Sequence, residues 1–281
     1  MDLLVFLAVL VAAAFHAGWN ALLKLNVEPI VATSLVAIAS GVVVVPLALI
    51  VGLPAPAAWP YLLGSVAVHI GYYTALAQAY RFGDLGQVYP IARGTAPLMT
   101  ALLAAFWVGE TLGPYAWAGI IVLSGGILLL AVKGRRALQA FDARSVGFAL
   151  LTSLTITVYT LNDGLGARVS GSALQYAVWL FLLSGGVMGI YGFMVLGRRL
   201  AGDFARHWKM AVAGAALSTA SYAIVIWAMT VAPIALVAAL RETSVLFAAL
   251  FGVVLLREPL LPARIAAACL VLAGVVLVRL R

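Results

Sequence analysis

The chain has 281 residues, of which 65% are hydrophobic and only 9% are charged. Because an average protein is roughly 25% charged, this composition excludes a water-soluble protein and indicates an integral membrane protein. The formal charge of +8 does not indicate nucleic-acid binding, because the basic residues lie in loops between apolar runs, where membrane topology explains them.

The first apolar run predicts a retained transmembrane helix, because Asp2 replaces the basic start of a signal peptide and the run continues into polar positions. Residues 16, 20 and 24 are four apart and share one helix face. Polar side chains are costly in lipid, so we expect His16, Trp19 and Asn20 to bind a solute in a watery interior. The alternative for Asn20 is a bond to a backbone carbonyl, and Lys24 is expected to reach the head groups.

Ten apolar runs are long enough to cross a bilayer, which takes about 20 residues. Every backbone amide in hydrocarbon must be bonded within its own segment, so runs of this length predict helices rather than barrel strands. The loops between them are short. The runs lie at about 3–23, 30–52, 58–80, 85–108, 114–132, 145–163, 172–197, 208–230, 233–256 and 262–280.

The chain repeats itself at a constant offset of 148 residues. RGTAPLMTALLAAFWVGETLGP at 93–114 corresponds to RETSVLFAALFGVVLLREPLLP at 241–262. Five helices are an odd number, so the second copy must be inverted in the membrane. We therefore predict an all-α integral membrane fold of ten transmembrane helices in two inverted five-helix repeats, residues 1–135 and 145–281. The matched pairs are Arg93 with Arg241, Glu110 with Glu258, Pro114 with Pro262 and Gly126 with Gly274.

The loops differ in charge between the two sides of the predicted membrane. One side carries twelve lysines and arginines, whereas the side with both termini carries three. The positive-inside rule assigns the basic side to the cytoplasm. We therefore expect a multi-pass protein of a bacterial inner membrane with both termini outside.

Two arginines lie within apolar helices. Arg93 lies about eight residues, or ~12 Å, inside its helix, with Tyr89 on the same face. A charge facing lipid at that depth costs about 2.5–3.5 kcal/mol. Because the copies are inverted, we expect Arg93 and Arg241 at opposite mouths of a central cavity, each binding a carboxylate or phosphate group. The alternative is a structural role in which both pair with Glu242 or with loop carbonyls.

Aromatic residues of three further helices are candidates for the same cavity. We expect His69, Tyr73 and Tyr222 to bind a polar ligand, because a buried phenol needs a hydrogen-bond partner. Tyr159 loosely corresponds to the polar stripe of the first helix and either lines the cavity or is structural. Asp163 is followed by glycines and indicates an ordinary helix end.

The sequence offers little for catalysis or ion conduction. The three histidines have no metal-ligand spacing, and no hydrolase or protease motif is present. Rings of like charge, which are typical of channels, are also missing. We expect no enzyme, metal or cofactor, with a small-molecule solute and the bilayer as partners of a monomer or homodimer. Proton coupling would need a titrating group in the membrane, for which His16 and Glu242 are the candidates.

Each repeat ends in a G-E-x-L-x-P-like turn before a glycine-rich helix and resembles the EamA-like branch of the drug/metabolite transporter superfamily. The stretches are GETLGPYAWAGIIVLSGGILLL at 109–130 and LREPLLPARIAAACLVLAGVVLV at 256–278, and HAGWNALLK resembles a subgroup's first-helix signature. The resemblance implies a secondary transporter that exports a small amino-acid-like or other zwitterionic or anionic metabolite by alternating access. The alternative is uptake or exchange of a phosphorylated or phosphonate-type solute.

Overall fold

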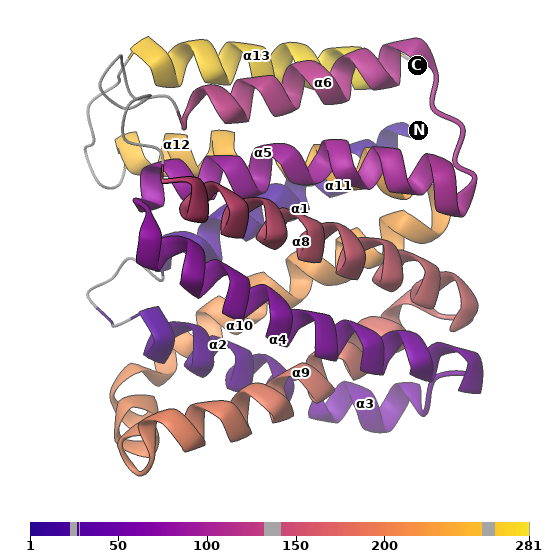
Figure 1. Ribbon diagram of the computed structural model, residues 1–281. Coiled ribbons are helices and arrows are strands. Elements are labelled where there is room, and N and C mark those ends of the chain that lie inside the picture. The colour runs from indigo at the N-terminus through magenta and orange to yellow at the C-terminus, as the bar shows by residue number, and fades with distance from the viewer. Residues whose placement is uncertain (23–26, 28, 132–141, 255–261, 281) are drawn as a thin grey trace.

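The structure of the protein is a computed structural model that describes residues 1–22, 27, 29–131, 142–254 and 262–280. Within these ranges the chain is helical and contains no strand, and most helices run along one common direction (Figure 1). The first half holds α1 (Leu3–Leu22), α2 (Pro29–Val43), α3 (Val45–Val51), the 3-10 turn η1 (Pro56–Ala58), α4 (Trp59–Phe82), α5 (Leu85–Leu103), the π-helical turn η2 (Ala104–Val108) and α6 (Pro114–Leu129). The second half holds α8 (Ala143–Val169), α9 (Ala173–Leu196), α10 (Arg199–Val231), α11 (Ile234–Arg241), α12 (Ser244–Val254) and α13 (Pro262–Arg279).

Eight segments of the described chain are long and apolar enough to cross a membrane. The prediction of an all-α, multi-pass membrane protein is therefore confirmed. α6 is apolar but has only 16 residues, and α4 has 24 residues with several polar side chains. The count of ten spans stays a prediction. The eight are α1, Val31–Val51, Gly86–Val108, α8, α9, α10, Ile234–Phe251 and α13.

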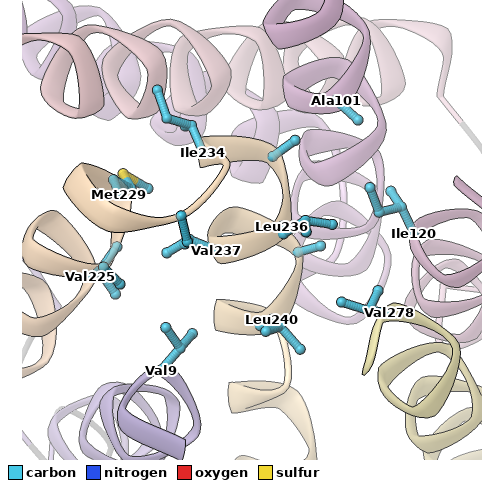
Figure 2. Packing of buried hydrophobic residues seen from close by; sticks show 14 of the residues in the cluster. Val9, Ala101, Ile120, Val225, Met229, Ile234, Leu236, Val237, Leu240 and Val278 are labelled. Carbon is cyan, nitrogen blue, oxygen red and sulfur yellow. The ribbon is translucent and has the colours of Figure 1, made fainter. Parts of the chain in front are cut away.

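The helices form layers. α6 and α13 pair along one edge of the bundle, and α9 lies with α2 and α3 at the opposite edge (Figure 1). Between the edges, α11 lies in the hydrophobic core, and all eight of its residues are buried. Its apolar side chains pack against those of α1, α6, α10 and α13 (Figure 2). Because α11 is enclosed by other helices, polar groups at its ends are removed from lipid as well.

Glycines bring two helix pairs into close contact. A Cβ atom at Gly274 of α13 would lie 2.7 Å from the carbonyl oxygen of Gly119 in α6. A Cβ atom at Gly185 of α9 would lie 2.7 Å from the Cα atom of Gly41 in α2. Such approaches exclude any side chain and are typical of membrane helix pairs. At Gly125 of α6, by contrast, a Cβ atom would have no neighbour within 4 Å.

The two ends of the described chain meet. The Arg279 Nη1 atom donates to the Met1 carbonyl oxygen at 3.4 Å, and its guanidinium lies 5.9 Å from the centre of the Phe6 ring. Figure 1 shows both ends on the same side of the bundle. The chain therefore enters and leaves the bundle at one face, as an even number of crossings requires.

Candidate functional site

The core helix α11 breaks where its polar residues begin. α11 ends at Arg241 and α12 starts at Ser244, with Glu242 and Thr243 in a turn between them. The Glu242 N–H donates to the Ala239 carbonyl at 3.1 Å, and the next residue makes the same three-residue step. The Thr243 hydroxyl also donates to the Leu240 carbonyl, at 2.7 Å. A discontinuous helix inside a bundle is the feature from which transporters build binding sites.

Glu242 lies between the two arginines that the sequence singled out. The Arg93 Nε atom is 2.9 Å from Glu242 Oε2, and the Arg241 Nη2 atom is 3.6 Å from Glu242 Oε1. The residues are 6%, 1% and 3% exposed for Arg93, Glu242 and Arg241. The expectation that the arginines lie at opposite mouths of a cavity is therefore wrong. Arg241 is the last residue of α11, and its guanidinium group and that of Arg93 both reach the Glu242 carboxylate.

The charges of this triad do not balance. Two guanidinium groups face one carboxylate, and the three side chains are almost fully removed from solvent. Arg93 Nε, Arg241 Nε and Glu242 Oε2 have no hydrogen-bond partner in the described part of the chain, so the 2.9 Å contact is an ion pair without hydrogen-bond alignment. Buried charged atoms without partners are costly and are normally satisfied by water or a ligand. The triad therefore carries an excess of one positive charge.

His16 joins the triad from α1. Its Nε2 atom is 3.3 Å from Arg93 Nη2, and its Nδ1 atom is 3.3 Å from the Trp19 Nε1 donor. Both neighbours are N–H donors, whereas a neutral imidazole has one acceptor nitrogen, so only one contact is a hydrogen bond at a time. Asn20 donates to the His16 carbonyl at 2.7 Å. His16 thus reaches Arg93, Trp19 contacts His16, and Asn20 bonds within its own helix.

Aromatic rings lie beside the triad. The Arg93 guanidinium is 6.0 Å from the centre of the Tyr89 ring. Tyr159 of α8 stacks on His69 of α4 at 4.5 Å and meets the edge of Tyr72 at 6.1 Å. The Tyr89 ring at Arg93 and the group formed by His69, Tyr72 and Tyr159 offer faces that can stack on the flat part of a ligand. Tyr73 lies beyond Tyr72 and is 39% exposed, so it is the most peripheral of the predicted ligand-binding residues.

Asp163 does not end a helix, contrary to the sequence-based expectation. α8 continues to Val169. The carboxylate is fully buried, accepting a hydrogen bond from Tyr176 at 2.9 Å and one from Tyr222 at 2.6 Å. The following glycine, Gly164, serves packing instead, since a Cβ atom there would lie 2.6 Å from Ile234 of α11. An Asp-Gly pair in the sequence cannot distinguish these two roles, and nothing along the chain marks Tyr176 as a partner.

A second polar network lies at the start of α11. Glu110, from the G-E-x-L-x-P-like turn, accepts the backbone N–H groups of Ile234 at 2.7 Å and Ala235 at 3.1 Å. Arg168 of α8 pairs with Glu110 at 3.1 Å and donates to the carbonyls of Met229 and Ala232. A carboxylate at a helix N-terminus satisfies free donors and favours the helix dipole. The motif therefore fixes the start of α11. Glu258, its counterpart, and Lys24 lie outside the described residues.

Residues 1–132 and 143–280 match the EamA-like transporter family. The chain belongs to the EamA-like transporter family. This membership confirms the resemblance of the chain to that family, and it makes the protein a membrane transporter of the drug/metabolite type. It points to transport rather than catalysis.

Two further similarities accompany this family membership. Over 68 residues, the EamA-like chain is 37% identical to the spermidine export protein MdtI of Klebsiella pneumoniae subsp. pneumoniae, a match that covers 24% of this chain and 61% of that protein. The chain is also similar to a solved crystal structure, with a TM-score of 0.75 and 18% identity over 99% of this chain and 96% of the other. That likeness shows a shared fold.

Proposed function

We propose that this EamA-like protein is a secondary transporter that exports a small organic solute with a carboxylate or comparable anionic group. The solute's anionic group binds Arg93 and Arg241 beside the broken helix. The observation that carries the proposal is the buried triad, in which two guanidinium groups share one carboxylate. A second carboxylate would complete the charge balance and accept from arginine N–H groups that have no hydrogen-bond partner in the described chain.

The surroundings of the triad favour a cargo that combines a charged and an apolar or aromatic part. The Tyr89 ring faces Arg93, and Trp19 is linked to Arg93 through His16. Aromatic faces bind flat or apolar groups. The cationic excess disfavours a polyamine such as the one in the name of the Klebsiella relative. Amino-acid-like and other zwitterionic solutes fit both features, whereas phosphorylated solutes fit the charge alone.

The packing of the helices supports alternating access between two inverted halves, 1–135 and 145–281. Under the repeat, α1 corresponds to α8, α4 to α10, and α5 to the pair α11 and α12. α4 packs against α8 as α10 packs against α1, and α5 packs against α8 as α11 and α12 pack against α1. α2 packs against its own counterpart α9, and α6 against α13. Such exchange of partners is expected of a two-fold pseudo-symmetric bundle that rocks about a central site.

The same reading makes α4 and α6 the remaining two of ten spans. The 24 residues of α4 extend about 36 Å, and the 16 residues of α6 about 24 Å, against a hydrocarbon core of roughly 30 Å. We propose that α4 spans in spite of its polar residues, because His69 and Ser65 face protein rather than lipid. With ten spans, the charge asymmetry of the loops gives both termini an outer location in the cell membrane.

The test uses purified protein and a panel of metabolites. Thermal unfolding would be measured with carboxylate-bearing amino acids, their amides, phosphorylated metabolites and spermidine. A carboxylate cargo at 100 times its Kd stabilises the folded state by about 2.7 kcal/mol, and its amide should not. Arg241→Gln should abolish the shift, while Arg206→Gln, at an exposed position, should retain it. Equal stabilisation by amides, or a shift that survives Arg241→Gln, would refute the proposed site.

Transport itself is tested with the solutes that stabilise the protein. Arg93→Ala and Arg241→Ala proteins, matched to the wild type in expression, should lose flux into or out of sealed vesicles. Normal rates in both variants would end the proposal that these arginines bind the cargo. Flux of phosphorylated solutes with no flux of amino acids would replace the cargo class and keep the site.

A further inference from the structure

Asp163 forms a second buried polar centre that the anion site does not use. It lies in the interior of α8 with 0% exposure. Tyr176 of α9 donates to Oδ1 and Tyr222 of α10 donates to Oδ2. Ser65 and His69 of α4 also interact with this carboxyl group. One carboxylate thus connects helices from both halves of the chain.

The charge of Asp163 has no direct cationic partner among the described residues. Tyr176, Tyr222 and Ser65 are neutral donors, and His69 is the titratable neighbour on α4. Nδ1 of His69 lies 2.7 Å from the Ser65 carbonyl, and the ring stacks on Tyr159 of the same helix as Asp163. Arg93 and Arg241, the charged residues of α5 and α11, which also pack on α8, are engaged with Glu242. The hydrogen bonds to Asp163 come from neutral donors, and His69 acts on the carboxylate electrostatically. A buried carboxylate held in this way can change its protonation without breaking a direct ion pair.

We propose that Asp163 is a proton-binding site separate from the anion site, and that proton binding there is coupled to movement of α9 and α10. The sequence suggested His16 and Glu242 for proton coupling, but the structure argues against both. Protonating Glu242 would leave two buried guanidinium groups without their carboxylate. Protonating His16 would create a cation 3.3 Å from Arg93 and leave the imidazole without an acceptor for either Arg93 or Trp19.

The coupling follows from the number of acceptors. The ionised carboxylate accepts one hydrogen bond on each oxygen, from Tyr176 and from Tyr222. When a proton binds, one oxygen becomes an O–H donor and a poorer acceptor, so the hydrogen bond from its phenol is weakened and can be lost or reversed. The bond that is lost or reversed joins α8 to α9 or to α10. A change of protonation therefore alters how these helices pack on α8, next to its interface with α4.

A proton suits this centre better than a metal cation. Hard cations take six or more oxygen ligands, whereas Asp163 offers two oxygens that both accept phenol hydrogen bonds. No group of three or more histidine, cysteine or acidic side chains surrounds a possible metal position within the described residues. The proton comes from water and returns to it, and no other atom is exchanged.

The proton site is tested without any cargo, so its failure is distinguishable from failure of the proposed transport function. Infrared difference spectra of the purified full-length protein are recorded while the pH is lowered, in sodium chloride and in choline chloride. We expect the carbonyl band of a protonated carboxyl group to appear in the wild type and in Glu242→Gln, and to be absent from Asp163→Asn. In Tyr222→Phe the band should appear at higher pH, because a donor to the ionised form is lost.

Three results would overturn the proton site: no titrating band in the wild type, a band that survives Asp163→Asn, or a band that sodium ions suppress. The last would indicate a sodium site. The Tyr222→Phe and Tyr176→Phe proteins keep the test decisive if Asp163→Asn does not fold, since each should shift the band and neither removes the carboxyl group.

The coupled movement, which rests on the proposed transport function, is tested by hydrogen exchange at one fixed pH. Asp163→Asn mimics the protonated carboxyl group, so amides of α9 and α10 should exchange faster than in the wild type. Asn162→Ala is the matched control on the same helix, because Asn162 donates to the Tyr61 carbonyl of α4 instead. Unchanged exchange in α9 and α10 of Asp163→Asn would show that proton binding is not coupled to these helices.

Discussion

Replacing Glu242 with glutamine isolates the energetic role of the charged triad. The substitution keeps the size of the side chain but removes the negative charge between Arg93 and Arg241. Both arginine side chains are at most 7% exposed, so solvent screens them little and each keeps its desolvation cost without its counter-ion. Removal of one partner from a buried ion pair costs about 3–5 kcal/mol. That is a large fraction of a typical folding free energy of about 5–15 kcal/mol.

The assay is thermal or denaturant unfolding of the purified protein at neutral pH. Asp203→Asn is the matched control, because it removes the carboxylate of the pair with Arg199, whose side chain is 63% exposed, and such pairs contribute about 0–1 kcal/mol. The double variant Glu242→Gln with Arg241→Gln restores the original net charge and should recover part of the loss. A loss for Glu242→Gln no larger than that of the control would refute the view that the triad is a buried, charge-unbalanced site.

Three other predictions concern the scaffold. Gly274→Val should destabilise the protein by about 1–3 kcal/mol through overpacking against α6. Gly125→Ala is the control and should unfold like the wild type, because a Cβ atom there has no neighbour within 4 Å. Equal unfolding of both variants would contradict the close α6–α13 contact. Glu110→Ala should cost about 0.5–2 kcal/mol in the same assay, because α11 loses the carboxylate at its N-terminus, and an unchanged midpoint would argue against this cap. Tags near position 140 and after Arg281 should be labelled from opposite faces of the membrane, and labelling from one face would rule out two inverted halves.

Several features of the fold could be predicted from the sequence because the membrane imposes them locally. Hydrocarbon requires each spanning segment to satisfy its own backbone, so apolar length alone located most helices to within a few residues. Exceptions occur where a helix extends beyond its apolar run. α10 begins at Arg199, ahead of the run predicted from 208, with non-helical backbone angles at His207. The depth of Arg93 and Arg241 in apolar runs likewise identified them as interior residues, because lipid does not accommodate a charge there.

The composition of the sites was decided only by tertiary packing. The sequence left open whether Arg93 and Arg241 pair with Glu242 or lie at separate mouths of a cavity, because that contact depends on where α11 breaks inside the core. Asp163 shows the same limit, since its two tyrosine partners lie on α9 and α10 and come together only when those helices pack on α8. The sequence by itself determined which residues could not face lipid. The three-dimensional arrangement determined which of them form ion pairs or hydrogen bonds with one another, because such partners must lie close together in space.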